Sequence, residues 1–398
     1  MYEKRIQEYL TEGGPTLYSY LCHYFSHFQY LAKAEPNIPQ LNWNVGETVL
    51  SIDGHPIIID RYVQSIKDLL QNCRDQVAEL FGSCPYQDIE AIIRRHTDPS
   101  DTDNWFRENP RNEDAGYSFI GENLHVFVNE EQDMTQRLLQ HVCGKMFELI
   151  NGSLVPHIHH IRKFFEQLDA LVDMLFLLSY FTWGGCPRGT EMEVLMYRNT
   201  PHSLRNLYFL NGIICTAFRY GKMSHRQGHS TLIMRTPAYD VGVLILLTIV
   251  AIYPTAAHLA RYLEDPSKAN NYLSFLFVKT GKVMNSDAFS KSLGHFMSQH
   301  HGKRLTLRPM RQVQTCLSIY FTHTDFSVPD AEDEEISRVH QMFGHSTAVG
   351  LKHYGVTYCD SLESISASTV RSHQRVSLLL HEHLGMSHPN QAKLQVRL

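Results

Sequence analysis

One stretch decides the fold of the second half of this 398-residue chain: Leu207-Tyr-Phe-Leu-Asn-Gly-Ile-Ile-Cys-Thr-Ala-Phe-Arg-Tyr220, followed by Thr231-Leu-Ile-Met-Arg235. Both parts are rich in β-branched and aromatic residues, and Asn211-Gly212 between two such runs is a strong hairpin signal. A second turn, rich in glycine and polar residues, separates Tyr220 from Thr231. We therefore predict a three-stranded antiparallel sheet with strands at 207–210, 213–220 and 231–235.

Apolar residues at helical spacing dominate the rest of the chain, which predicts a mainly α fold of the α+β class. A small hairpin that turns at Asp53-Gly54 and a loop over 97–114 interrupt the helices. Ser286 is the expected N-cap of one helix. The predicted helices cover 16–34, 61–81, 132–150, 160–181, 241–263, 287–300, 309–321, 335–342, 347–354 and 370–384.

The chain is long enough for two domains. Asn151-Gly-Ser and Pro156 indicate a boundary, so we expect a helical domain over 1–152 and a second domain over 153–398. The longest apolar run, 241–252, is shorter than the roughly 20 residues that cross a bilayer. We interpret it as a buried helix and expect no membrane partner.

The formal net charge is −5, which as a whole-chain value argues against a nucleic-acid binder. The local balance differs, because seven Lys or Arg oppose two Glu between Arg188 and Arg235, and seven oppose one Asp between Lys279 and Arg311. Such basic residues either lie on solvent-exposed helix faces or converge on phosphates. Two basic clusters that flank an apolar helix favour the second interpretation.

Neither cysteine nor histidine spacing predicts a metal site. The eight cysteines are scattered, with no C-x-x-C pair. His157, His159 and His160 have no acidic or cysteine partners at ligand spacing, so they are interpreted as a helix start. We expect no metal and no cofactor.

Six residues in the second half together suggest phosphate chemistry: Arg188, Lys222, Arg308, Arg311, His345 and Tyr354. Arg188 and Arg311 can each offer a planar fork of donors to the non-bridging oxygens of one phosphodiester. Tyr354 is a suitable nucleophile, because a phenoxide leaves more readily than an alkoxide and the linkage can be resealed. Lys222 can protonate the departing 5′ oxygen, and His345 can hydrogen-bond the phosphate.

At these residues the chain resembles the tyrosine recombinase (phage-integrase-like) family. Phe343-Gly-His-Ser-Thr-Ala-Val-Gly-Leu-Lys-His-Tyr354 is similar to that family's box ending in the nucleophile, with nine residues from His345 to Tyr354. Gly185-Cys-Pro-Arg188-Gly-Thr-Glu191 is similar to the first-arginine box, in which the Glu supports the fold. Residues 276–306 resemble the run into the second-arginine box. The resemblance covers 165–358 and is nearest to eukaryotic, especially fungal, Crypton-type members.

The resemblance implies a site-specific DNA recombinase that acts through a 3′-phosphotyrosine intermediate without a metal. It implies a helical core DNA-binding domain over 1–152, a catalytic domain over 153–398 and a clamp around duplex DNA. It also implies homo-oligomers, with two protomers on each site and four in the synapse. A C-terminal segment, here 370–384, is exchanged between neighbours in such assemblies. A nuclear location follows from the DNA substrate alone.

Two departures from the family pattern keep alternatives open. Arg308 stands where the family usually has a histidine, so the proton acceptor for the tyrosine is in doubt, although a nearby cation favours phenolate. The 34 residues between Arg311 and His345 exceed the usual spacing, and the acidic run 330–335 is expected to form a surface loop. A DNA-binding protein derived from a recombinase and a relaxing topoisomerase remain alternatives.

Several residues compete with those assignments. Arg188 taken alone suits a salt bridge with Glu191 on a helix. Arg219 and Arg226 lie on the same hairpin as Lys222, and Tyr358 lies one helical turn beyond Tyr354. The order and spacing of the whole set favour the residues chosen above.

Overall fold

The computed structural model describes residues 24–25, 41–84, 86–129, 132–151, 153–220, 231–263, 265–323 and 367–391. It is mainly α, with small antiparallel sheets, as expected. The chain divides into two compact units, residues 1–56 and 57–398. The predicted helices at 335–342 and 347–354 lie outside the described residues, as does nearly all of the predicted helix at 16–34.

The first unit contains β1 (Leu41–Trp43) and β2 (Val49–Ile52), which pair antiparallel. Asn44 closes their turn, since its side-chain Oδ1 accepts from the backbone N–H of Thr48 at 2.8 Å. β3 (His55–Ile58) completes the sheet order β1-β2-β3 after a turn in which Asp53 and Gly54 have φ values of 50° and 76°. This is the predicted small hairpin.

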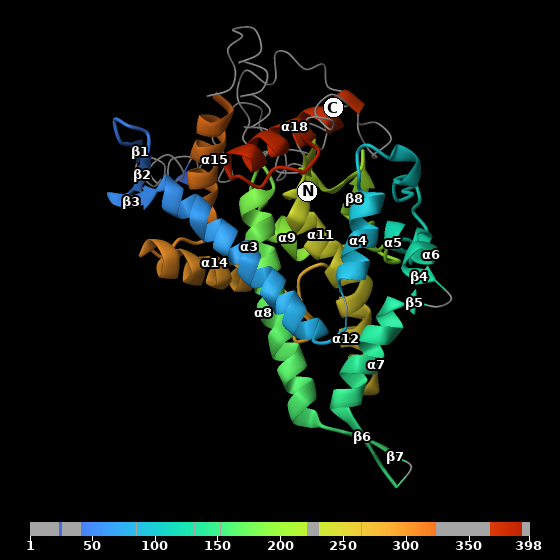
Figure 1. The fold of residues 1–398 in the computed structure, drawn as a ribbon. Helices are drawn as coiled ribbons and strands as arrows, with labels where there is room; N and C mark the ends of the chain where they lie inside the picture. The colour runs from blue at the N-terminus through green and yellow to red at the C-terminus, as the bar shows by residue number, and fades with distance from the viewer. Residues whose placement is uncertain are drawn as a thin grey trace, which may run out of the picture. The chain divides into compact units, whose positions relative to one another are not determined.

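Two long helices form the core of the second unit. α3 (Ile59–Phe81) buries Tyr62, Ile66, Cys73 and Val77 at helical spacing and packs on α8 (Ile158–Thr182) (Figure 1). α8 is almost wholly buried over its last two turns, which end at the turn that carries Arg188. Burial of this apolar surface is the main stabilising contribution to the unit.

The central sheet has the order β10-β9-β8, with β8 (Leu207–Leu210), β9 (Ile213–Tyr220) and β10 (Thr231–Arg235). All three predicted strands have the predicted bounds. Asn211 and Gly212 both have positive φ, as a two-residue hairpin turn requires. A Cβ on Gly212 would lie 2.6 Å from the Trp105 ring, so the turn also needs glycine for space.

The second unit contains further helices and short strands. They are α4 (Gln87–His96), η1 (Thr102–Asn104), α5 (Phe119–Glu122), α6 (Leu124–Phe127), β4 (Val128–Asn129), β5 (Gln132–Asp133), α7 (Met134–Met146), β6 (Phe147–Ile150), β7 (Ser153–Pro156), α9 (Gly189–Glu193), α11 (Tyr239–Leu247), η2 (Thr248–Ile252), α12 (Tyr253–Tyr262), α13 (Pro266–Tyr272), β11 (Val278–Lys279), β12 (Lys282–Val283), α14 (Ser286–His301), α15 (Leu307–His323) and α18 (Ala367–His383).

One predicted helix start needs correction. Asn285, rather than Ser286, caps α14, because its side chain accepts from the backbone N–H of Ala288 at 2.9 Å. Asn151 lies at the tip of the β6–β7 hairpin, which projects from the ends of α7 and α8 (Figure 1). A separate DNA-binding domain over 1–152 stays a prediction.

The apolar run at 241–252 is part of a longer helical segment, Tyr239–Tyr262, made of α11, η2 and α12. Within the described ranges this is one segment long and apolar enough to cross a membrane, by length and composition. Of its most apolar window, 89% is buried inside the protein. Its burial agrees with the expected core helix.

α18 packs on α15, on β10 and on the end of α8. His381 Nε2 donates to the Thr182 carbonyl at 2.7 Å, and Ser377 Oγ donates to the Trp183 carbonyl at 3.4 Å. Gln374 Nε2 donates to the Leu210 carbonyl at 3.1 Å. The helix is therefore docked on its own chain, and its exchange between protomers stays a prediction.

Candidate functional site: an arginine cluster

Arg188 lies at the start of α9, directly after the turn that follows α8. Its backbone N–H donates to Glu191 Oε2 at 3.1 Å, so the Glu191 carboxylate reaches back to the N-cap as in a capping box. The Arg188 side chain is half-buried. The acidic side chain in the first turn of α9 also complements the helix dipole.

α15, which carries Arg311, packs directly against this turn. Tyr180 Oη donates to the Leu307 carbonyl at 3.1 Å, and Ser318 Oγ donates to the Gly184 carbonyl at 3.3 Å. A Cβ on Gly189 would lie 3.1 Å from Leu307 Cδ1 and 2.4 Å from Ser286 Oγ. The glycine after Arg188 thus permits the starts of α14 and α15 to approach the first-arginine turn.

α14 is attached to the same turn by a carboxylate. Glu193 Oε1 accepts from both the backbone N–H and the hydroxyl of Ser286, at 2.6 and 2.5 Å. α9 and the consecutive helices α14 and α15, which follow it by more than 90 residues, therefore meet at one place.

A third arginine, Arg235 at the end of β10, belongs to the same cluster. It is 1% exposed, its Nη1 lies 3.4 Å from Glu191 Oε2, and its guanidinium carbon lies 5.4 Å from the centre of the Phe218 ring. Burial lowers the pKa of Arg235 to about 10; the Glu191 charge opposes this shift, and the charges of Arg311 and Arg188 add to it. Both predicted arginines are therefore near enough to repel Arg235.

Two nearby groups can be excluded as nucleophiles. Tyr180 and Cys186 are both about 1% exposed. Burial raises the pKa of Tyr180 well above its usual value, and burial raises the pKa of Cys186 to about 12, although Arg311 and Arg235 oppose the latter shift. Both groups are enclosed by the protein and out of reach of a phosphate in solvent.

The structure places the other predicted site residues as follows. Arg308 is exposed in the first turn of α15, one turn before half-buried Arg311. Lys222, His345 and Tyr354 lie outside the described residues. The structure thus brings together Arg188 and Arg311, two residues of the predicted set.

Exposed basic side chains continue from this cluster along α14. Lys291 and His295 are exposed one helical turn apart. Arg304, also exposed, packs over the helix, since a Cβ on Gly294 would lie 3.0 Å from its side chain. Lys291, His295 and Arg304 therefore form an exposed basic face on and beside α14, whereas Arg311 of the same sequence cluster is half-buried.

The histidines at the start of α8 form no ligand set. His160 Nδ1 donates to the Lys145 carbonyl at 2.7 Å, and His157 lies 3.5 Å from Glu148. Within the described part of the chain, no group of three or more His, Cys, Asp or Glu is arranged to hold a metal ion. The expected helix start is confirmed.

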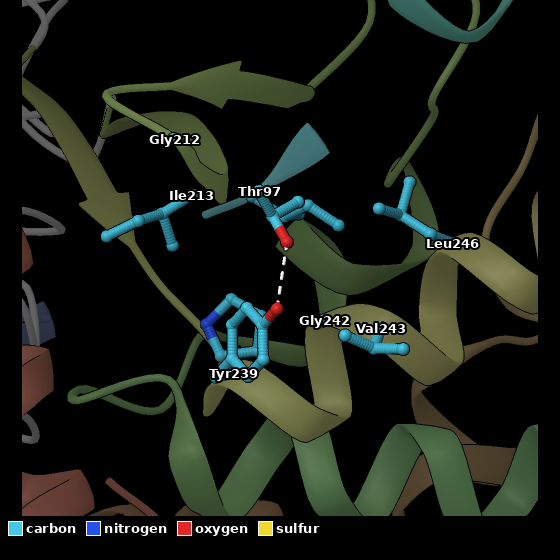
Figure 2. Close-up of a pocket in the computed structure, with 9 residues that line it drawn as sticks. Thr97, Gly212, Ile213, Tyr239, Gly242, Val243 and Leu246 are labelled. Atoms are coloured by element: carbon cyan, nitrogen blue, oxygen red, sulfur yellow. Dashed lines mark hydrogen bonds between the residues drawn. The ribbon is translucent and has the colours of Figure 1, made fainter. Parts of the chain in front are cut away.

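The best-defined pocket of the described surface lies elsewhere, between α4, the β8–β9 turn and α11. Figure 2 shows the Thr97 and Tyr239 hydroxyls in hydrogen-bond contact across it, at 2.9 Å. It encloses about 20 Å³, which suits about one water molecule. It is lined by Thr97, Gly212, Ile213, Ile214, Pro237, Tyr239, Gly242, Val243 and Leu246.

No protein-family model matches this chain, and neither a curated protein nor a solved structure is similar to it.

Arg235 was not among the predicted site residues. A signal was available, because alternation along β10 places Arg235 on the same face as Ile233, which is 1% exposed. A charged residue that shares a face with a buried apolar one indicates a buried charge and hence a partner.

Proposed function

We propose that this protein breaks and rejoins DNA strands as a site-specific recombinase of mobile-element type, with Tyr354 as the nucleophile. The observation that supports the proposal is the contact between the first-arginine turn and α15. It gathers Arg188 and Arg311, which are 123 positions apart in the chain, beside one buried Arg–Glu pair. Two guanidinium groups at one place suit the two non-bridging oxygens of a phosphodiester.

In the proposed reaction Tyr354 loses its phenol proton to solvent, the phenolate being favoured by nearby cations, and its oxygen attacks the phosphorus while the bond to the 5′ oxygen breaks. The enzyme is then joined to the 3′ phosphate, and Lys222 supplies the proton that the 5′ oxygen needs. Arg188 and Arg311 stabilise the charge that develops on the phosphoryl oxygens. Attack by a 5′ hydroxyl on the phosphotyrosine reverses these steps and reseals the strand.

The domain organisation belongs to the same proposal. Residues 1–152 and the catalytic domain at 153–398 clamp duplex DNA, and the basic face of Lys291, His295 and Arg304 on and beside α14 neutralises phosphates. The active assembly is a homo-oligomer with two protomers on each site, and the protein acts in the nucleus.

The test is trapping on a nicked suicide duplex made from the DNA that flanks the gene. The wild type should form an adduct that resists SDS, Tyr354→Phe should form none, and the matched control Tyr358→Phe should keep it. No adduct with wild type, or an adduct with Tyr354→Phe, would contradict the mechanism.

A second candidate function is DNA binding without cleavage, which is favoured by exposed Arg308 at the usual histidine position. It predicts salt-dependent duplex binding that survives both Tyr354→Phe and Arg311→Ala, with no covalent product. Arg308→His discriminates, because it should accelerate adduct formation in an active recombinase and change nothing in a protein that only binds. Relaxation of any supercoiled plasmid, regardless of sequence, would indicate a topoisomerase instead.

A further inference from the structure

Arg235 joins the central sheet to the first-arginine turn. Its backbone is held in β10 opposite Thr216 of β9, and the Thr216 hydroxyl donates to the Arg235 carbonyl at 3.3 Å. Its side chain is buried over Phe218 and ends at Glu191. A buried guanidinium fixed at both ends is a rigid support.

Glu191 has two partners on one oxygen. Oε2 accepts from the backbone N–H of Arg188 at 3.1 Å and lies 3.4 Å from Arg235 Nη1. The position of that oxygen therefore sets the start of α9, and Arg235 helps to set the position of the oxygen.

The same carboxylate lies among cations that a phosphate would need. Arg188 and Arg311 both act electrostatically on Arg235, whose partner is Glu191. A Glu191 carboxylate released from Arg235 is attracted to the remaining cations of the cluster, Arg188 and Arg311. It would then compete with a phosphate for the same donors.

We propose that Arg235 is a positioning residue of the phosphate site: it holds Glu191, and through Glu191 it fixes the turn that presents Arg188 and keeps the carboxylate off the phosphate-binding arginines. The part of this inference that concerns catalysis rests on the proposed function, whereas the part that concerns the turn does not.

The first measurement needs no DNA. Hydrogen exchange is followed in the full chain for a peptide that contains Arg188 to Glu193, in wild type and in Arg235→Lys, whose shorter ammonium cannot reproduce the guanidinium contact. We expect the Arg188 amide to exchange at least about tenfold faster in the variant, because its acceptor is no longer held. The matched control is Arg205→Lys, which alters another buried arginine, paired with Glu108.

The second measurement is the rate of adduct formation on the suicide duplex, with the dissociation constant for the same DNA. Arg235→Lys should slow the adduct about 10- to 100-fold, since small displacements of a catalytic group have effects of that size. Its DNA dissociation constant should stay within about threefold, because phosphate contacts elsewhere dominate affinity. Arg205→Lys should leave the rate for folded protein unchanged.

A double variant tests whether the two residues act as one unit. Glu191→Gln should slow the adduct as Arg235→Lys does, and the two changes together should be no slower than the slower single one. Should Arg235→Lys fail to fold, Glu191→Gln replaces it as the test variant, and Glu108→Gln replaces Arg205→Lys as the control.

The outcomes are distinct. Unchanged exchange at Arg188 in Arg235→Lys, or equal slowing by the Arg235 and Arg205 variants, overturns the positioning role. A wild type that forms no adduct, together with faster Arg188 exchange in Arg235→Lys, overturns the proposed function and leaves the positioning of the turn in place.

Discussion

Two buried arginine–glutamate pairs in this molecule differ in their surroundings. Arg205 Nη2 lies 2.7 Å from Glu108 Oε1. Its guanidinium also donates to the Asn109 and Asn112 carbonyls, at 2.8 and 3.0 Å, and to Asn199 Oδ1 at 3.1 Å. The second Glu108 oxygen accepts from a backbone N–H of β8 at 3.2 Å. This pair ties the 97–118 loop to the central sheet and is balanced one cation to one anion.

The pair of Arg235 and Glu191 is longer, at 3.4 Å, and two more arginines lie near it. Within the described residues of this cluster, Glu191 pairs with the Arg235 guanidinium, and the charges of Arg188 and Arg311 also act on Arg235. This difference distinguishes a buried ion pair that stabilises the fold from one that belongs to a binding site. A balanced pair with many backbone acceptors holds the fold, whereas an excess of one sign at the meeting point of several elements suits an additional ion of the opposite sign.

The largest expected effect comes from breaking the balanced pair. Arg205→Met would leave the Glu108 carboxylate buried without its cation and should lower the free energy of unfolding by about 3–5 kcal/mol. Arg235→Met should cost less, about 1–2 kcal/mol, because its contact with Glu191 is longer and the Glu191 side chain is 13% exposed, against 4% for Glu108. Urea denaturation measures both, with exposed Arg95→Met as a control. Equal losses for the two variants would remove the distinction between the pairs.

Acid titration sharpens the comparison, because arginine keeps its charge at pH 5 and the acid response must therefore come from other groups. Burial lowers the pKa of His381 to about 4, and burial likewise lowers that of His388 to about 4. As pH falls below about 6.5, these two histidines bind protons in the unfolded chain before they do so in the folded protein. Their contribution to the free energy of unfolding is therefore present above pH 6.5 and is lost progressively down to pH 4. The loss should be about 2 kcal/mol for His381 between pH 7 and pH 5.

Glu108 contributes with the opposite sign. Burial raises its pKa, so the unfolded state loses its proton first and stability from this group falls as pH rises above about 4.5. Denaturation at pH 7 and pH 5 should show a smaller difference in His381→Gln than in wild type. Arg235→Lys should show the wild-type difference. An unchanged difference in His381→Gln would mean that other groups control acid stability.

The smallest expected effect concerns the excess positive charge of the arginine cluster. Inorganic sulfate should stabilise the wild type, relative to sodium chloride of equal ionic strength, by about 1 kcal/mol at a free concentration about five times its dissociation constant. Arg205→Lys should keep this increment and Arg188→Met should lose it. Thermal unfolding measures the shift, and equal responses to the two salts in wild type would contradict an anion site at the cluster.

The sequence predicted the central sheet to the residue because Asn211-Gly212 and the β-rich runs act locally. The joint action of Arg188 and Arg311 on one phosphate, which rests on a resemblance in the order of motifs, stays a prediction. The sequence did not predict the β6–β7 hairpin, since Asn151-Gly152 was interpreted as a domain boundary although the same dipeptide turns hairpins. A short run of turn-forming residues does not by itself distinguish a linker between domains from the turn of a hairpin.

The partner of Glu191 could not be predicted from the sequence, for a different reason. Spacing suggested a partner three residues away, Arg188, whereas the structure adds Arg235 from 44 positions further along the chain. Burial of a charge depends on which elements pack together, and no local pattern states that. The signal that was available, an arginine on a buried strand face, predicts that a partner exists and does not name it.

The docking of α18 has a consequence for how the chain is joined. Residues 324–366, which include Tyr354, connect α15 to α18 in the chain, and α18 is packed on both α15 and β10. Both attachment points are thus on or beside the elements that bear Arg311 and Arg235. A polypeptide that ends after α15 and a second one that begins within 324–366 would still have the α15–α18 contact to join them, so the protein is a natural candidate for reconstitution from two fragments.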